Sequence, residues 1–172
     1  MGRNFIFGRS GILIRPYQKD AGGVGLNYLF DTNAAIELSK VYKEPYENEV
    51  QSLFGKLLVQ GSLVFYSVIT QAEFLSGKSK VNNIDFVNYF ELEEAEEFLS
   101  VTPIIAKTAG NLRDKLSTMD QPIKIKMPDA LILATAITHD LVLVTADADF
   151  RFSKILGVET FIFKPAAGIE GI

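Results

Sequence analysis

The sequence predicts an α/β fold in which helices cover both faces of a mostly parallel sheet. Short apolar segments alternate with segments of helical periodicity between residues 28 and 163, and this alternation is typical of βαβ units. The strand segments are apolar throughout, as expected for strands that are buried on both faces. The chain has 172 residues, of which 48% are hydrophobic and 22% charged. This composition indicates one globular domain and excludes a disordered or low-complexity protein.

The predicted elements follow one another without a linker or an internal repeat. Strands are expected at 28–30, 63–66, 98–101, 141–144 and 160–163, and helices at 34–40, 45–60, 70–76, 83–96, 103–116, 128–139 and 152–156. Gly61 is expected to end the second helix, because glycine adopts the backbone conformation that follows many helices. Pro103 and Pro128 stand at helix starts, where proline is favoured. Five glutamates between residues 91 and 97 predict a solvated face on the fourth helix.

Residues 1–27 differ in composition from the rest and hold six of the 13 glycines. Two short apolar runs, at 5–7 and 12–14, flank a turn that contains Gly8 and Gly11. This pattern predicts a β-hairpin, and a flexible arm is the alternative. We therefore divide the chain into an N-terminal extension, residues 1–27, and a main domain, residues 28–172.

Several kinds of protein are excluded by what the sequence lacks. There is no cysteine and only one histidine, His139, so a metal site must be built mainly from oxygen ligands. No apolar run approaches the roughly 18 residues of a membrane span, and the first residues lack the apolar core of a signal peptide. We expect a cytoplasmic protein without a membrane partner. The net charge of −4 argues against a general nucleic-acid coat, but it leaves room for a local basic groove.

Acidic side chains stand where the predicted strands end or where the next helices begin. Asp31 directly follows the first strand, and Asp147 and Asp149 follow the fourth, while Glu73 and Asp129 lie near helix starts. A parallel sheet brings these positions to one edge, where ligands bind in such folds. Clustered carboxylates repel one another unless a cation lies between them. The pattern therefore predicts a site for hard divalent cations, which prefer carboxylate oxygen.

Each of these acids also has a purely structural interpretation. Asp31 could cap the next helix, Thr70 and Glu73 fit a capping box, and Asp129 is a favoured acid for a first turn. Asp147 and Asp149 could belong to a turn. The helix after Asp129 is, however, apolar nearly all round, which predicts burial on several sides. An ionised acid at its start needs a partner, and a metal ion is one.

Four segments in order carry a resemblance to a known family: Leu29–Asn33, Ser67–Phe74, Pro128–Ala136 and Leu143–Phe150. With this spacing the chain resembles PIN-domain ribonucleases, and most closely the VapC-type toxins of type II toxin–antitoxin pairs. The resemblance implies a three-layer α/β/α sandwich around a five-stranded parallel sheet. It also implies a Mg²⁺- or Mn²⁺-dependent endoribonuclease that leaves 5′-phosphate and 3′-hydroxyl ends. An antitoxin protein and a second copy of the chain are the implied partners.

The resemblance also assigns roles to individual residues. The catalytic acids of the family match Asp31, Glu73, Asp129 and, at the fourth place, either Asp147 or Asp149. Family members use either position of this turn; we favour Asp147, and assign metal binding to it and to the first three acids. Asn33 and Thr145 match polar residues that orient ligands or water. Residues 1–27 depart from the pattern, because the family usually begins at the first strand.

Basic residues near the predicted site are candidates for contacts with RNA phosphates. Lys124 and Lys126 alternate with apolar residues just before Asp129, and Arg113 is a further candidate. The alternative for each is ordinary solvated surface. We expect RNA hydrolysis by the toxin of a toxin–antitoxin pair. The rival functions are a non-toxin PIN nuclease and a non-catalytic PIN-like binding module. A haloacid-dehalogenase-type phosphatase is disfavoured, because Asn33 stands where its general acid would be.

Overall fold

The computed structural model describes residues 5–6, 13–14, 26–40, 49–78, 81–93 and 95–165. Its main sheet consists of five parallel strands: β3 (Tyr28–Phe30), β4 (Val64–Ser67), β5 (Phe98–Leu99), β6 (Val142–Thr145) and β7 (Thr160–Ile162). The helices are α1 (Thr32–Ser39), α2 (Glu49–Gln60), α3 (Val68–Ser76), α4 (Ile84–Phe90), α5 (Pro103–Ser117), α6 (Met127–His139) and the 3₁₀ helix η2 (Ala148–Leu156). The predicted α/β class and the five-stranded parallel sheet are confirmed.

The order of the strands in the sheet is β5-β4-β3-β6-β7, so the first strand of the sheet lies at its centre. The chain builds one half of the sheet outward from β3 and then returns to build the other half, beginning with β6. In register, Phe30 at the end of β3 pairs with Tyr66 on one side and with Val144 on the other. The change of direction between β3 and β6 makes their carboxyl ends the topological switch point of the sheet, where open α/β sheets bind ligands.

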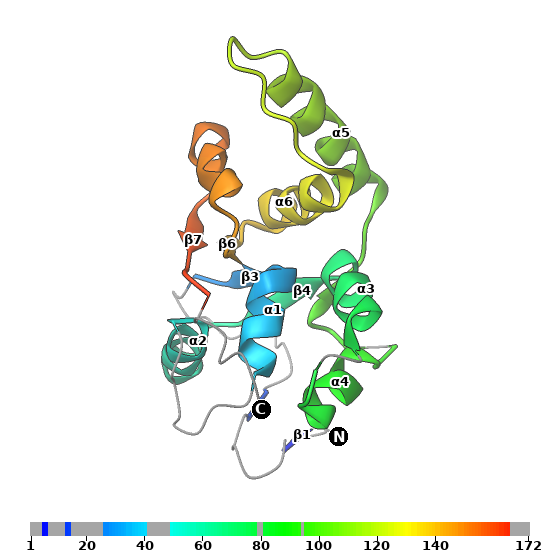
Figure 1. Cartoon of the computed structure of the whole chain (residues 1–172), viewed down its shortest axis with the longest axis vertical. Coiled ribbons are helices and arrows are strands. Elements are labelled where there is room, and N and C mark those ends of the chain that lie inside the picture. The colour runs from blue at the N-terminus through cyan, green and yellow to red at the C-terminus, as the bar shows by residue number, and fades with distance from the viewer. Residues whose placement is uncertain are drawn as a thin grey trace.

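Successive side chains of the central strand enter two different cores. Leu29 belongs to a cluster with α5, α6 and η2, whereas Phe30 belongs to a cluster with α1, α2 and α4. These helices form the layers on either side of the sheet, and α5 extends to one end of the molecule (Figure 1). Helix α6 is buried on several sides, as its apolar sequence predicts. Within the described ranges, no helix is both long enough and apolar enough to cross a membrane.

The prediction of an acid-rich helix over 83–96 is wrong about where the helix ends, because α4 ends at Phe90. The side chain of Gln71 explains where it ends: its Nε2 donates to the carbonyl oxygens of Phe90 at 2.8 Å and of Leu92 at 3.0 Å. These bonds take backbone acceptors that a longer helix would use itself. Carboxylates after Phe90 also oppose continuation, because negative charge is unfavourable at a helix C-terminus.

The remaining boundaries differ less from the predictions. Helix α2 ends before Gly61, whose φ of 73° confirms its predicted role, whereas residues 41–48 lie outside the described part. The short helix predicted at 152–156 begins earlier, at Ala148, and is 3₁₀ rather than α. Two strands, β1 (Phe5–Ile6) and β2 (Leu13–Ile14), pair antiparallel, as the predicted hairpin requires. The residues that join them are not among those described.

Candidate active site

Asp31 lies at the end of β3 and is 5% exposed. Its Oδ1 accepts a hydrogen bond of 2.8 Å from the backbone nitrogen of Ala34, so the predicted helix cap is confirmed. Its Oδ2 accepts a bond of 2.5 Å from the hydroxyl of Thr145, across the junction between β3 and β6. The two oxygens thus have separate tasks, and capping α1 does not exclude Asp31 from a site at the sheet edge.

Burial makes the charge of Asp31 costly. The pKa of this carboxyl is raised from 3.8 to about 7, mainly by desolvation and to a smaller extent by the negative charge of Asp147. The bonds from Thr145 and Ala34 act in the opposite direction and favour the ionised form. Because Asp147 affects this pKa, the two acids share one electrostatic environment. A cation beside them would offset both the desolvation and the repulsion.

Thr145 joins the carboxyl ends of β3 and β6 at the switch point of the sheet. Its side chain is fully buried at the end of β6. The hydroxyl donates to Asp31 and accepts a bond of 3.0 Å from the backbone nitrogen of Asp147. It therefore fixes the orientation of one acid and the backbone position of the other. Thr145, which the resemblance expects to orient ligands or water, thus bonds directly to one of the predicted acids.

The capping box predicted for Thr70 and Glu73 is wrong. Helix α3 begins earlier, with Ser67 as N-cap; its hydroxyl accepts from the backbone nitrogen of Ile69 at 3.2 Å. Glu73 therefore lies in the second turn rather than the first, and its Oε2 accepts a hydrogen bond from the hydroxyl of Thr32 on α1. Sequence reasoning missed this role of Thr32, because no local pattern links two residues 41 positions apart.

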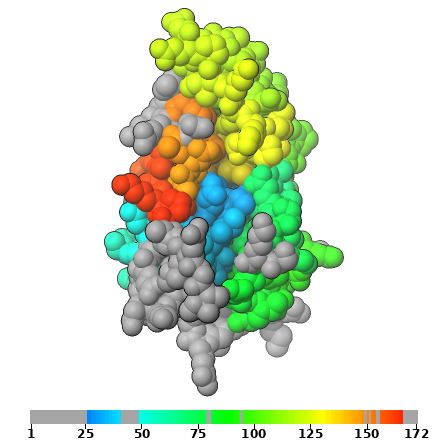
Figure 2. All heavy atoms as spheres, in the orientation of Figure 1, coloured from blue at the N-terminus to red at the C-terminus, as the bar shows by residue number. Residues whose placement is uncertain are grey.

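The elements that carry the predicted acids adjoin one another. Helix α3 contacts both α1 and α6, and Asp129 lies half-buried in the first turn of α6. Figure 2 shows the blue region of α1 at the centre of one face, between the green of α3, the yellow of α6 and the orange of η2. Asn33 has an exposed side chain in the first turn of α1. The side chain of Asp149 lies outside the described part of the structure.

The donor set fits Mg²⁺ or Mn²⁺ only as a site of few protein ligands. Among the described side chains, no three of Asp, Glu, His or Cys gather closely enough to hold a metal ion by themselves. Magnesium, however, is commonly bound through one or two carboxylates, several waters and the phosphates of a substrate. Asp31, with its desolvated carboxylate, and the neighbouring Asp147 match that kind of site.

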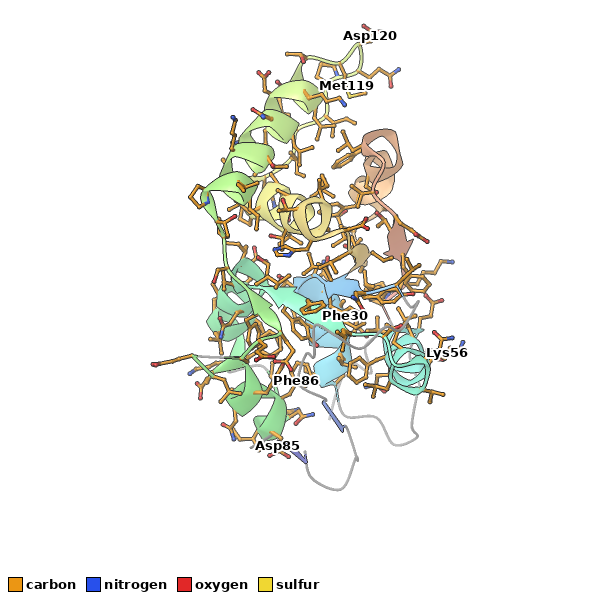
Figure 3. The ribbon with its side chains drawn as sticks, turned by 180° about the vertical axis from the view of Figure 1, so that it is seen from behind. Phe30, Lys56, Asp85, Phe86, Met119 and Asp120 are labelled. Atoms are coloured by element: carbon orange, nitrogen blue, oxygen red, sulfur yellow. The ribbon has the colours of Figure 1, made fainter. Side chains whose placement is uncertain are left out.

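The basic candidates differ in their surroundings. Lys124 and Lys126 have exposed side chains. Arg113, on α5, donates its Nε hydrogen to the backbone carbonyl of Ile125 at 3.2 Å. Its guanidinium is thus bonded to the segment that carries the two lysines. Figure 3 labels Met119 and Asp120 at the tip from which this segment returns toward α6.

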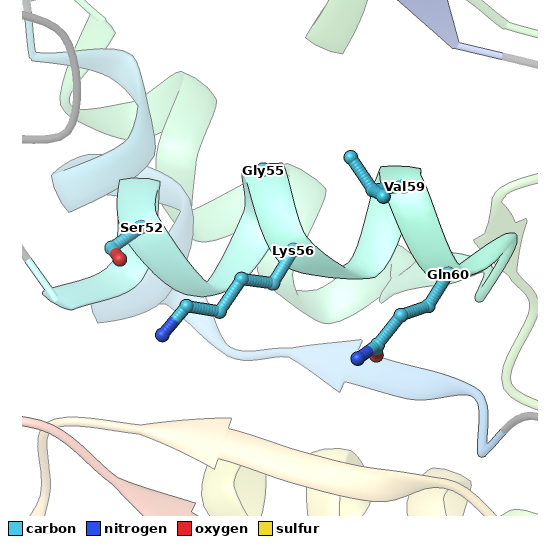
Figure 4. Close-up of a pocket in the computed structure, with 5 residues that line it drawn as sticks. All are labelled: Ser52, Gly55, Lys56, Val59 and Gln60. Atoms are coloured by element: carbon cyan, nitrogen blue, oxygen red, sulfur yellow. The ribbon is translucent and has the colours of Figure 1, made fainter.

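A separate pocket runs along α2 and is lined by Ser52, Gly55, Lys56, Val59 and Gln60 (Figure 4). These residues recur at helical spacing on one side of the helix. None of the predicted acids is among them. The pocket is therefore distinct from the acidic edge of the sheet, and the acids are the better candidates for chemistry.

A protein-family model and several solved structures are similar to this chain. The PIN domain family model matches residues 28–155. Among solved structures, FitAcB from Neisseria gonorrhoeae is 25% identical, covering 78% of this chain and 96% of that one, with a TM-score of 0.58. A toxin–antitoxin complex from Klebsiella pneumoniae is 27% identical, over 73% and 91% of the two chains, with a TM-score of 0.50.

A third solved structure supports the fold alone. It is VapBC2 from Rickettsia felis, bound to a DNA fragment from its own promoter, with 22% identity and a TM-score of 0.61. The alignment covers 81% of this chain and 100% of that one. No curated protein matches the chain in sequence.

Proposed function

Because the chain belongs to the PIN domain family, we propose that it is a Mg²⁺- or Mn²⁺-dependent endoribonuclease and the toxin of a toxin–antitoxin pair. The observation that carries this proposal is the pair of acids, Asp31 and Asp147, at the switch point of the sheet and bridged by Thr145. Residues 28–172 form the proposed nuclease domain. Residues 1–27 are proposed to be an extension outside it.

In this proposal Asp31 and Asp147 hold the divalent cation directly, with Asp149 as the alternative to Asp147, and Glu73 and Asp129 complete the acidic site through intervening water. When bound, the cation activates a water molecule for attack and neutralises charge on the phosphodiester. Thr145 keeps an Asp31 oxygen in a fixed direction, so this carboxylate does not have to reorient when substrate arrives. Such preorganised charge is worth most where water is excluded.

The remaining polar residues serve the attacking water. Thr32 orients the Glu73 carboxylate through its hydroxyl. Glu73 and Asp129 lie on neighbouring helices, are only half-buried and so remain accessible to a water molecule and its proton. Asn33 is exposed beside Asp31 and is proposed to orient that water or the substrate.

The direct test is a cleavage assay on the purified full chain. We expect single-stranded RNA to be cut with Mn²⁺ or Mg²⁺, to stay intact with EDTA, and to yield fragments with 5′-phosphate ends. A DNA of the same sequence is the matched control. RNA that is bound but never cut would favour the non-catalytic binding module. Cleavage that continues in EDTA would contradict the proposed dependence on a divalent cation.

Manganese is expected to stabilise the folded chain. A cation that binds only the native state raises the free energy of unfolding by mass action, here by roughly 1–3 kcal/mol at saturation. The melting temperature should rise with millimolar MnCl₂ or MgCl₂ and not with NaCl of equal ionic strength. The control is Asp31→Asn with Asp147→Asn, in which the shift should largely vanish. A wild-type chain without any shift contradicts the proposed cation site.

Deleting residues 1–25 tests the proposed domain boundary. The deleted segment contains none of the predicted catalytic acids and precedes β3. Metal-dependent cleavage should stay within about tenfold of the full chain, since domain boundaries tolerate truncation. Circular dichroism confirms that the shortened chain is folded. Complete loss of cleavage in a folded truncation assigns the extension to the active site or to an obligatory dimer.

The proposed partner is an antitoxin protein. The solved relatives include a toxin–antitoxin complex, and this chain covers most of their length. We expect a small reading frame next to this gene whose product, when co-expressed, copurifies with the chain and blocks its nuclease activity. A homodimer is the proposed assembly of the chain itself, and its mass in solution tests that proposal.

A further inference from the structure

The segment that joins α5 to α6 is held to α5 at two points of its backbone. The backbone nitrogen of Ile123 donates to the carbonyl oxygen of Leu116 at 2.9 Å. Two residues later, the carbonyl oxygen of Ile125 accepts the Nε hydrogen of Arg113 at 3.2 Å. The side chain of Ile125 is 8% exposed and belongs to the core beside α5 and α6. One side of the segment is thus fixed against the protein.

The other side of the segment carries two lysines. Consecutive side chains of an extended chain point in opposite directions, and Lys126 has extended backbone angles, φ −68° and ψ 158°. Because Ile125 enters the core, its neighbours Lys124 and Lys126 are directed outward, and both are exposed. The bond from Arg113 to the carbonyl of Ile125 therefore helps to fix the backbone from which the two lysines extend.

Lys126 lies at the helix start that carries a predicted catalytic acid. Lys126 is the N-cap residue of α6 and makes no side-chain cap bond, and Asp129 is the third residue of that helix. N-cap and third helical residues lie beside each other, as in a capping box. A positive charge is unfavourable at a helix N-terminus. The helix N-terminus therefore does not favour this lysine, whereas the phosphates of a bound polyanion would offset its charge.

We propose that Arg113 is a positioning residue for the RNA substrate: by bonding the carbonyl of Ile125, it holds Lys124 and Lys126 where they contact backbone phosphates beside Asp129. This inference rests on the proposed ribonuclease function and deepens it. It assigns phosphate binding to the two lysines and gives Arg113, a predicted RNA contact, a positioning role instead. The lysines bind the sugar–phosphate backbone and carry no base preference.

A double-mutant cycle on RNA binding tests this assignment. Binding of a fluorescent single-stranded RNA to the full chain is measured in EDTA, at several salt concentrations, so that no cleavage occurs. Lys124→Gln with Lys126→Gln should lower the slope of log K against log salt by about 1.4, because each phosphate contact on a single strand contributes about 0.7. Lys115→Gln is the matched control: it removes an exposed charge from α5 near Arg113 and should leave the slope unchanged.

Arg113→Ala should raise the dissociation constant about fivefold in the wild-type background and hardly at all in the double-glutamine background, because coupled residues are not additive. Arg113→Lys keeps the charge but loses the Nε–H donor, and we expect it to behave like the alanine variant. Equal losses in both backgrounds, with full rescue by lysine, would show that Arg113 contacts phosphate directly and would overturn the proposal.

The outcome is separable from that of the proposed function. Failure of the ribonuclease proposal appears as absence of Mn²⁺-dependent cleavage, whereas failure of this inference appears in binding without metal. Under cleavage conditions, Arg113→Ala should raise KM about fivefold and change kcat less than twofold, since it removes substrate binding away from the reacting atoms. The inference is overturned if Arg113→Ala lowers kcat alone. It is also overturned if the lysine substitutions leave the salt dependence of RNA binding unchanged.

Discussion

Replacing Glu73 by Gln is expected to lower RNA cleavage by about two orders of magnitude, the scale of losing one preorganised polar or charged group. The melting temperature should change by only a few degrees. The amide oxygen of Gln can still accept the hydroxyl hydrogen of Thr32, so the contact between α1 and α3 is retained. What disappears is the negative charge, on which holding a cation or activating water depends. Initial rates with Mn²⁺ and thermal melts measure the two effects.

Two further variants separate charge from structure. Thr32→Val removes the hydrogen bond but leaves the charge of Glu73, so it should cost less activity than Glu73→Gln. Asp31→Asn keeps a side-chain oxygen for the cap on Ala34 and removes a buried charge. It should therefore cleave as poorly as Glu73→Gln and melt within a few degrees of wild type, because removal of a desolvated charge offsets the loss of the acceptor for Thr145. Wild-type rates for both acid variants would return these residues to a structural role.

Replacing Thr145 by Val should reduce stability and activity together. The isosteric change removes the donor to Asp31 and the acceptor for the Asp147 nitrogen, both at a fully buried position. Leaving buried polar groups unpaired costs about 1–3 kcal/mol of unfolding free energy. For a chain of this size that corresponds to a fall in Tm of about 2–12 °C. Loss of the bond from Thr145 also raises the pKa of Asp31 further, which disfavours its charged form.

Cleavage by Thr145→Val should fall at least about tenfold, because the Asp31 carboxylate loses a preorganised partner. Thr145→Ser is the matched control: it keeps the hydroxyl and should restore most of the activity. If the valine variant melts lower but cleaves at the wild-type rate, Thr145 has only a structural task. The role in orienting Asp31 is then wrong.

The sequence by itself determined the class of the fold and the places where its elements meet. Apolar strands alternate with periodic helices, and burial of those strands on both faces follows from their composition. Gly61 and Pro103 mark helix boundaries because their backbone preferences act locally. Asp31 could be placed at a strand end and a helix start for the same reason.

Tertiary structure alone decided which of these side chains bond to one another. Thr145 and Asp31 are separated by 114 positions, and Thr32 and Glu73 by 41, so no local pattern could link them. The early end of α4 depends likewise on Gln71, which belongs to another helix. The same holds for Arg113, whose bond to Ile125 exists only because α5 packs against α6. Backbone propensity acts over a few residues, whereas the partner of a polar side chain is set by which strands and helices become neighbours.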